Sequence, residues 1–276
     1  HRLSEIADDY DALLCDALGV IHNGVTLFDG VDEALSSFRK ERGPVVILTN
    51  APRPSSIIPA QLDRIGLSRG AYDAVVTSGD ATRAAIESLL PRPLYRLGPD
   101  KDKSLYEGLN VDFAPIERAG FIVCTGLEDD SRETPADYAD FLQRAAARGL
   151  SMVCANPDIV VRWGDRLIYC AGGLAEAYEK LGGNVVYGGK PYAPIYDLAC
   201  RRLAGIKGRA LDRRRILAIG DGVKTDIAGA GQNGFPSLFI AGEGGVHEGA
   251  ADAAGITLAL QRAGVAADYA AGGLFW

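Results

Sequence analysis

Four polar clusters stand where apolar runs end or a helical pattern begins, and each carries a side chain that can do chemistry. They are Asp16 in CDALGVIHNG (15–24), Thr49 with Asn50 in VVILTNAP (45–52), Lys190 in GGKP (188–191), and Asp221 with Asp226 in GDGVKTD (220–226). Taken singly, an aspartate or a threonine in such a place usually ends a strand or caps a turn. The ordered set of four is harder to explain in that way, so we treat it as one candidate site.

Three carboxylates, a hydroxyl and an amine in one crevice suit the chemistry of phosphate. Neighbouring carboxylates repel one another, so their charge must be compensated by a lysine or a cation. Oxygen ligands favour Mg²⁺, and no His or Cys spacing indicates zinc. A screened Asp16 could then attack phosphorus and form an acyl phosphate. The Thr49 hydroxyl and backbone N–H groups at the start of the next helix would hold the phosphoryl oxygens.

Elements of alternating type must position these side chains. Short apolar runs predict strands, and apolar residues at three- and four-residue spacing between them predict helices. The strands are expected at 11–16, 43–50, 72–79, 214–221 and 236–242, and the helices at 31–41, 56–66 and 193–205. This alternation predicts an α/β fold with a doubly wound parallel sheet. Ligands bind at the carboxyl ends of such strands, which would bring Asp16, Thr49 and Asp221 together.

A second unit interrupts the alternation. The proline-flanked stretch PRPLYRLGPD (91–100) opens it and KLGGNVVYGG (180–189) closes it. Between them lie further predicted strands at 120–126 and 150–158 and a helix at 136–149. We therefore expect a Rossmann-like core formed by 1–90 and 187–276, with an α/β domain inserted at 91–186.

Composition excludes several classes of function. The net charge of −7 argues against a nucleic-acid partner, because binding to the phosphate backbone depends on Lys and Arg. No apolar run reaches the 18 residues of a membrane span, and no signal pattern opens the chain. The five cysteines show no paired metal spacing and are expected to be reduced and buried. A cytoplasmic protein with no membrane partner is the expectation.

The motifs together resemble those of a known family. CDALGVIHNG, VVILTNAP, GGKPYAPIY (188–196) and ILAIGDGVKTDIAGA (216–230) look like the four motifs of the haloacid dehalogenase (HAD) superfamily in their usual order. The long insert, with ANPD (155–158) inside it, resembles subclass IIA, which contains NagD-like sugar phosphatases and pyridoxal phosphate phosphatases. The resemblance implies a Mg²⁺-dependent phosphatase that acts on a small phosphorylated metabolite through an aspartyl-phosphate.

The family pattern implies a role for each matching position. Asp16 would be the nucleophile and a Mg²⁺ ligand. The Leu18 backbone carbonyl and Asp221 would be the other protein ligands of Mg²⁺, and Asp226 would support the metal site through water or hydrogen bonding. Lys190 would neutralise the nucleophile and the phosphate. Thr49 and the Asn50 backbone would bind phosphoryl oxygens, and Asn156 and Asp158 would lie on a substrate-facing loop of the cap. The apolar tail GGLFW (272–276) is expected to pack on the core, with a subunit contact as the alternative. Caps and apolar tails of this kind often support dimers in similar proteins.

One position departs from the family pattern. Phosphatases of this superfamily usually carry a second aspartate two residues after the nucleophile as general acid and base, and here Leu18 stands in its place. Because such catalysis is worth ~10²- to 10⁴-fold, attack on alkyl phosphates should suffer most. His22 is a candidate replacement. Two alternatives stay open: a phosphate-binding scaffold with little turnover, and phosphoryl transfer limited to activated acyl or aryl phosphates.

Two weaker signals concern loops. Arg162 and Trp163 in VVRWGDR (160–166) could contact substrate, although a strand hairpin of the insert explains them equally well. The glycines of AGEGGVHEG (241–249) predict a loop near the carboxyl edge of the sheet.

Overall fold

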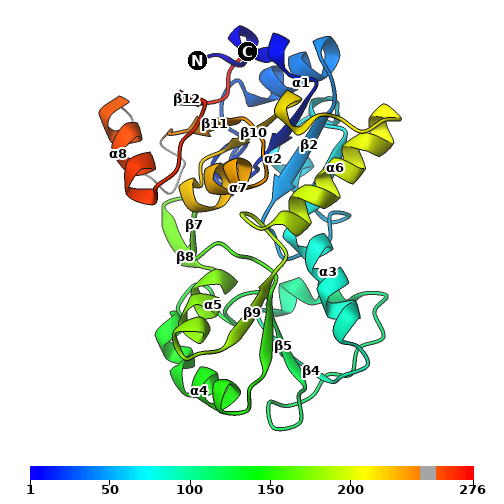
Figure 1. Cartoon of the computed structure of the whole chain (residues 1–276), viewed down its shortest axis with the longest axis vertical. Helices are drawn as coiled ribbons and strands as arrows, with labels where there is room; N and C mark the ends of the chain where they lie inside the picture. Colours follow the sequence, from blue (N-terminus) through cyan, green and yellow to red (C-terminus); the bar gives the residue numbers. More distant parts are fainter. Residues whose placement is uncertain (243–252) are drawn as a thin grey trace.

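The computed structural model describes residues 1–242 and 253–276 and forms two α/β units, stacked along the long axis of the molecule (Figure 1). The larger unit is built on six parallel strands in the order β12-β11-β10-β1-β2-β3. These strands are β1 (Ala12–Cys15), β2 (Val45–Thr49), β3 (Ala74–Thr77), β10 (Ile216–Gly220), β11 (Ser237–Ile240) and β12 (Tyr269–Ala271). The predicted α/β fold with a parallel core sheet is confirmed.

Alternation along the strands fixes which residues face which layer. Leu13 and Cys15 pack into a cluster with helices α1 (Val31–Glu41) and α2 (Ile58–Ile65), whereas Leu14 packs with α6 (Ala193–Lys207) on the other face. Successive side chains of a strand point to opposite faces, so a strand that is buried on both sides is apolar throughout. The helices of this unit are α1 (Val31–Glu41), α2 (Ile58–Ile65), α3 (Ser78–Leu89), α6 (Ala193–Lys207), α7 (Ala228–Gln232) and α8 (Ala253–Ala263).

The order of the strands places the topological switch at β1. The chain moves from β1 to β2 and β3 on one side, and later continues through β10, β11 and β12 on the other. At such a reversal the loops at the carboxyl ends of the central strands diverge and leave a crevice. Asp16 follows β1 and Asp221 follows β10, so both stand at this crevice.

The smaller unit has its own sheet and its own core. Its four strands are parallel and run in the order β4-β5-β6-β9, with an antiparallel pair β7-β8 beside them. They are β4 (Leu94–Leu97), β5 (Phe121–Cys124), β6 (Ser151–Cys154), β7 (Val160–Trp163), β8 (Arg166–Tyr169) and β9 (Asn184–Tyr187). Helices α4 (Ala139–Ala147) and α5 (Ala171–Lys180) cover this sheet. In Figure 1 the β7-β8 hairpin lies between the two units.

Short helical turns complete the described chain. The 3₁₀ turns are η1 (Leu3–Glu5), η2 (Ala7–Asp9), η3 (Arg69–Ala71), η4 (Asp100–Tyr106), η5 (Pro135–Tyr138) and η6 (Arg213–Arg215), and η7 (Val223–Ile227) is a π-helix. The two termini meet: the Leu3 N–H donates to the Phe275 carbonyl at 2.8 Å, and Leu274 is buried in the core. The loop predicted at 241–249 lies almost wholly outside the described residues.

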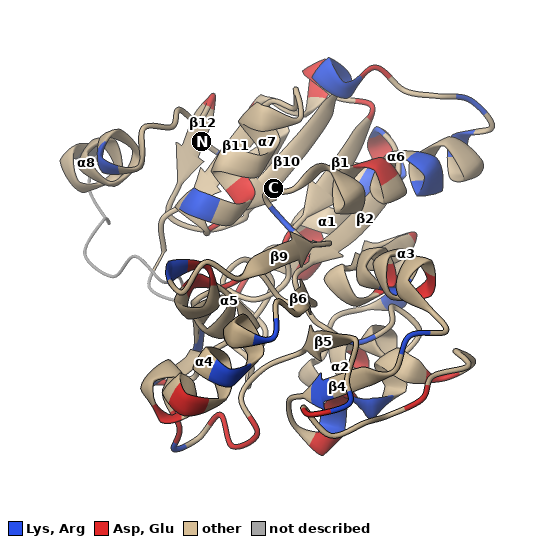
Figure 2. Ribbon diagram, turned by 60° about the horizontal axis from the view of Figure 1, so that its bottom comes forward, with Lys and Arg blue, Asp and Glu red and all other residues tan. Residues whose placement is uncertain are grey.

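Charges of both signs are interspersed over the two units (Figure 2). All five cysteines are free thiols, and four of them are buried. None of the helices that the structure describes has the length and apolar character needed to cross a membrane.

Candidate active site at the carboxyl edge of the core sheet

Asp16 and Asp221 are held at adjacent strand ends. The Asp16 N–H continues the ladder between β1 and β10 by donating to the Ile219 carbonyl at 2.8 Å. Both residues are buried, since Asp16 is 8% exposed and Asp221 is 5% exposed. The turn after Asp16 passes so close to Asp221 that a Cβ on Gly19 would lie 2.3 Å from a carboxylate oxygen. Gly19 also has φ +95°, so both space and backbone conformation require glycine there.

Lys190 lies at the centre of the cluster. Its ammonium donates to Asp16 Oδ1 at 2.6 Å, to Asp226 Oδ1 at 2.7 Å and to the Leu48 carbonyl at 2.9 Å. These three acceptors match the three N–H donors of the ammonium group. Only 2% of Lys190 is exposed, so the ammonium group interacts with these acceptors away from bulk water. The carbonyl of Leu48 is an acceptor that the side-chain pattern of the sequence did not predict.

Burial and charge set the protonation of this cluster. Burial raises the pKa of Asp16 to about 7, although Lys190 opposes that rise and Asp226 adds to it. Burial alone would lower the pKa of Lys190, but the surrounding carboxylates outweigh it and hold the pKa well above its ordinary value. The lysine is therefore a fixed positive charge beside a carboxylate that burial disfavours in its ionised form.

The carboxylates of Asp16, Asp221 and Asp226 fit a divalent cation. One oxygen from each lies within 4.8 Å of the others. Hard oxygen donors with two or more negative charges are what Mg²⁺ binds. Both oxygens of Asp226 already accept hydrogen bonds, Oδ1 from Lys190 and Oδ2 from the Gly222 N–H at 3.0 Å. Asp226 thus suits a supporting position. Asp16 accepts the lysine hydrogen bond on Oδ1, which leaves Oδ2 for direct contact with a metal.

Thr49 ends β2 and Asn50 follows it on the same edge, but the two residues have different roles. Thr49 is 8% exposed and lines the cavity. The Asn50 side chain forms two hydrogen bonds with the backbone of Lys190. Its Oδ1 accepts from the Lys190 N–H at 2.8 Å, and its Nδ2 donates to the Lys190 carbonyl at 3.2 Å. A Cβ on Gly189 would come within 2.5 Å of that amide oxygen, which explains a glycine before the lysine.

Asn156 and Asp158 reach the site from the smaller unit. They stand in the loop after β6, where Asn156 Oδ1 accepts from the Asp158 N–H at 3.1 Å and so fixes the turn. Asp158 Oδ1 accepts a hydrogen bond from Asn50 Nδ2 at 3.0 Å, across the two units. Burial raises the pKa of Asp158 to about 6.

Leu18 and His22 lie in the loop after Asp16, and both line the cavity. His22 Nδ1 accepts from the Gly24 N–H at 2.9 Å, so that nitrogen is used to shape the turn. Burial lowers the pKa of His22 to about 4. At neutral pH the imidazole is therefore uncharged, and the one nitrogen that could take up a proton is already an acceptor.

A cavity of about 1590 Å³ lies between the two units and is lined by these side chains. The β7-β8 hairpin closes one side of it: the Gly164 N–H donates to the Asn23 carbonyl at 2.8 Å. The Trp163 ring lies so close to Gly24 that a Cβ there would be 2.5 Å away. The sequence pattern explains Trp163 equally well by a substrate contact or by a hairpin position. In the structure Trp163 ends β7 of the hairpin, packs on Gly24 and lines the cavity.

Two family models match the chain. A haloacid dehalogenase-like hydrolase model covers residues 13–112, and a HAD-hydrolase-like model covers 187–270. The crystal structure of a haloacid dehalogenase-like family hydrolase from Brucella suis 1330 is 41% identical, with a TM-score of 0.90. That match covers 99% of each chain.

Other relatives carry more specific names. The D-glycerol 3-phosphate phosphatase of Mycobacterium tuberculosis is 25% identical over 241 residues, which are 86% of this chain but 65% of that protein. A glycerol phosphate phosphatase of the same organism, solved in complex with magnesium, is 25% identical with a TM-score of 0.65 and covers 87% of this chain and 70% of that one. A p-nitrophenyl phosphatase from Archaeoglobus fulgidus, at 21% identity and TM-score 0.71, shares the fold.

Proposed function

Because this chain belongs to the haloacid dehalogenase-like hydrolases, we propose that it is a Mg²⁺-dependent phosphatase. Its substrate would be a small phosphorylated metabolite, and the reaction would pass through an aspartyl-phosphate on Asp16. The observation that carries this proposal is the position of Lys190, whose ammonium bridges Asp16 and Asp226 beside Asp221. The phosphatase relatives support it.

In the proposed reaction the Asp16 carboxylate attacks phosphorus, and the bond from phosphorus to the alcohol oxygen breaks. Water then attacks the phosphorus of the acyl phosphate, which releases inorganic phosphate and regenerates the carboxylate. Lys190 holds Asp16 in place and stays protonated through both steps, offsetting the charge of the phosphoryl oxygens. The Thr49 hydroxyl and the Asn50 backbone hold those oxygens in line with Asp16.

Asp16, Asp221 and the Leu18 carbonyl would hold Mg²⁺, and Asp226 would support that site. The ion would supply neutralisation of the phosphate and orientation of its oxygens. The donor set fits this group because three carboxylates with a single lysine among them leave negative charge to be compensated.

We infer that the smaller unit, predicted as residues 91–186, acts as a cap that selects the substrate and excludes water. It supplies Asn156, Asp158 and the β7-β8 hairpin to the cavity. The homodimer and the cytoplasmic location expected from the sequence stay predictions.

The test is phosphate release from a panel of alkyl, aryl and acyl phosphates, with Mg²⁺ or with a chelator. Wild type should turn over at least one class and lose that activity with the chelator, and Asp16→Asn should lose it under all conditions. Asp29→Asn, the same change in an exposed loop of the larger unit, is the matched control and should keep wild-type activity. Thermal shifts with Mg²⁺ report binding separately.

Activity that survives in Asp16→Asn would contradict the proposal. Stabilisation by Mg²⁺ and phosphate without turnover of any panel member would instead favour a phosphate-binding scaffold, the alternative that Leu18 motivates.

A further inference from the structure

The proposed reaction lacks an evident proton donor for the departing alcohol. Leu18 stands where the family usually places an aspartate, and its side chain cannot exchange a proton. In phosphoryl transfer the attacking and leaving oxygens lie roughly in line on opposite sides of phosphorus. Asp16 attacks from the carboxyl edge of the core sheet, so the leaving oxygen faces the smaller unit. A replacement donor is therefore to be sought on that unit.

Asp158 occupies such a position. It belongs to the loop after β6 of the smaller unit, and it lines the same cavity as Asp16, Thr49 and Lys190. Its Oδ1 accepts a hydrogen bond from Asn50 Nδ2, and the Oδ1 of the same asparagine accepts from the Lys190 N–H. That contact fixes the carboxyl group, and its Oδ2 accepts no hydrogen bond within the described part of the chain.

The surroundings of Asp158 suit a group that alternates between acid and base. Burial raises its pKa to about 6, Lys190 and the Asn50 hydrogen bond oppose that rise, and Asp226 adds to it. The other titratable groups that interact with it electrostatically are Asp16, Cys154 and Cys170. A general acid and base works best with a pKa close to the working pH.

Three other titratable groups that line the cavity, His22, Cys170 and Tyr187, suit the task less well. The Nδ1 of His22 is engaged by the Gly24 N–H, and its lowered pKa leaves no imidazolium at neutral pH. Burial holds the pKa of the Cys170 thiol and of the Tyr187 hydroxyl well above their ordinary values, so neither releases a proton readily.

We propose that Asp158, delivered from the smaller unit, is the general acid and base that replaces the aspartate absent at Leu18. This inference rests on the proposed phosphatase function. As the bond from phosphorus to the alcohol oxygen breaks, the Asp158 carboxylic acid gives its proton to that oxygen. The Asp158 carboxylate then takes a proton from the water that attacks the Asp16 acyl phosphate. Phosphate leaves, and both aspartates return to their starting forms.

With Asp158 as the proton donor, catalysis depends on docking of the smaller unit. Because Asp158 reaches the site only through the contact between its loop and Asn50, a substrate that keeps the two units apart would also lose its proton donor. Because Leu18 has no proton to donate, the larger unit alone would not protonate the leaving group of a wrongly bound phosphate ester.

The experiment compares wild type with Asp158→Asn on an alkyl phosphate, glycerol phosphate, and an aryl phosphate, p-nitrophenyl phosphate, both with Mg²⁺. The amide of the variant can still accept from Asn50 Nδ2, so the contact between the units is retained. We expect kcat/KM for the alkyl phosphate to fall ~10²- to 10⁴-fold and kcat/KM for the aryl phosphate to fall far less. Rapid mixing of the variant with the aryl phosphate should give a burst of about one equivalent of nitrophenol before slow turnover, because hydrolysis of the acyl phosphate has lost its base.

Asp140→Asn is the matched control, because it is the same change at an exposed position on helix α4 of the smaller unit, and it should match wild type. Equal losses on both substrates, or no loss, would overturn the role of Asp158 and leave the phosphatase proposal standing. If wild type hydrolysed neither of the two phosphates, the proposed function itself would fail, and this inference with it.

Discussion

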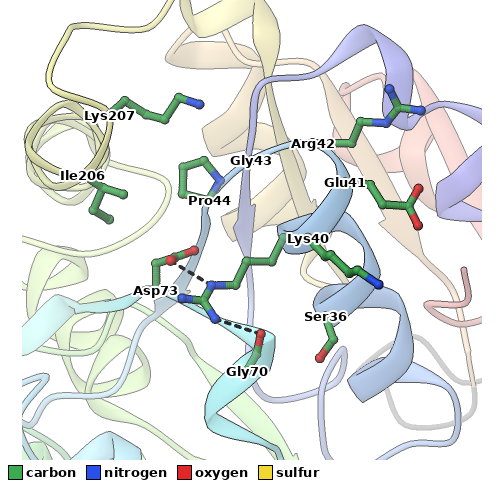
Figure 3. Close-up of a pocket in the computed structure, with 11 residues that line it drawn as sticks. Ser36, Lys40, Glu41, Arg42, Gly43, Pro44, Gly70, Asp73, Ile206 and Lys207 are labelled. Atoms are coloured by element: carbon green, nitrogen blue, oxygen red, sulfur yellow. Dashed lines mark hydrogen bonds and ion pairs between the residues drawn. The ribbon is translucent and has the colours of Figure 1, made fainter.

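The two ends of the core sheet each carry a cation between elements, and they use it in opposite ways. At the carboxyl end, Lys190 is 3% exposed as a side chain and bridges Asp16 and Asp226 at 2.6 and 2.7 Å. At the amino end, Arg39 is 38% exposed and pairs with Asp73 at 2.8 Å in a pocket of about 470 Å³ (Figure 3). Arg39 also donates to the Gly70 carbonyl at 3.1 Å, and dashed lines in Figure 3 end at the labelled Asp73 and Gly70.

The partners explain the difference. The second oxygen of Asp73 accepts a hydrogen bond from the Val45 N–H at the start of β2. The ion pair at the amino end therefore links α1 to the loop before β3. The charges of Arg39 and Asp73 are matched one to one, and the arginine reaches solvent. At the carboxyl end one lysine serves several buried carboxylates, which leaves negative charge that only a ligand can balance. Charged groups at strand ends therefore indicate a site when they are buried and unequal in number, and a structural tie when they are exposed and matched.

Lys190→Met breaks the carboxyl end most severely. We expect turnover to fall by ~10²- to 10³-fold or more, since a fixed donor of charge at the phosphate is lost. Without metal, the free energy of unfolding should fall by about 3–5 kcal/mol, because Asp16 and Asp226 lose their buried partner. Urea titration with and without Mg²⁺ measures this, and Mg²⁺ should restore more stability to the variant than to wild type. Lys207→Met, at the amino-end pocket, should change neither quantity; an equal loss there would contradict the comparison.

The pH dependence of leaving-group preference sharpens the comparison at the side of the smaller unit. With the pKa of Asp158 raised to about 6, its acid form prevails below that pH and is lost above it. The ratio of kcat/KM for an alkyl phosphate to that for an aryl phosphate should thus fall by up to about tenfold per pH unit above 6. Taking the ratio cancels titration of groups that serve both substrates. In Asp158→Asn the ratio should be flat with pH, and a fall that persists in the variant would assign it to another group.

The hairpin contact should have a smaller effect, on docking of the smaller unit. Gly24→Ala places a methyl group against the Trp163 ring and also strains a residue at φ +93°. Part of its cost should vanish in the Trp163→Ala background, with a coupling of about 1 kcal/mol in a double-mutant cycle on KM for p-nitrophenyl phosphate. Leu167→Ala, on the same hairpin but 61% exposed, is the matched control. Strict additivity would mean that the ring and the loop do not act together.

Arg39→Met should have the smallest effect. It removes an exposed ion pair worth about 1 kcal/mol or less, so the melting temperature should drop by a few degrees at most. Activity and Mg²⁺ stabilisation should be those of wild type, because the change lies at the opposite end of the sheet from Asp16. A loss of turnover in this variant would show that the two ends are coupled through the sheet.

Patterns that are local in the chain were predicted well. The strand before Asp16 and the strand before Asp221 are short apolar runs, and the helices α1 and α6 follow three- and four-residue spacing, so local periodicity suffices to find them. The place of Asp16 at a sheet edge follows from that alone. The partners of His22 and Asn50 could not be predicted, because a backbone N–H in a turn and a peptide 140 residues away leave no mark in the side-chain pattern.

The sequence by itself determined the order of five of the six core strands, the position of charged residues at their ends, and the absence of an aspartate at Leu18, because these depend on residue type and short-range spacing. Only the tertiary structure decided that one lysine would serve Asp16 and Asp226, that Asn50 would hold Lys190 and Asp158 together, and that Trp163 would pack on Gly24. These contacts join residues that lie far apart in the chain, and their distances are set by how the two units pack, which no local pattern encodes.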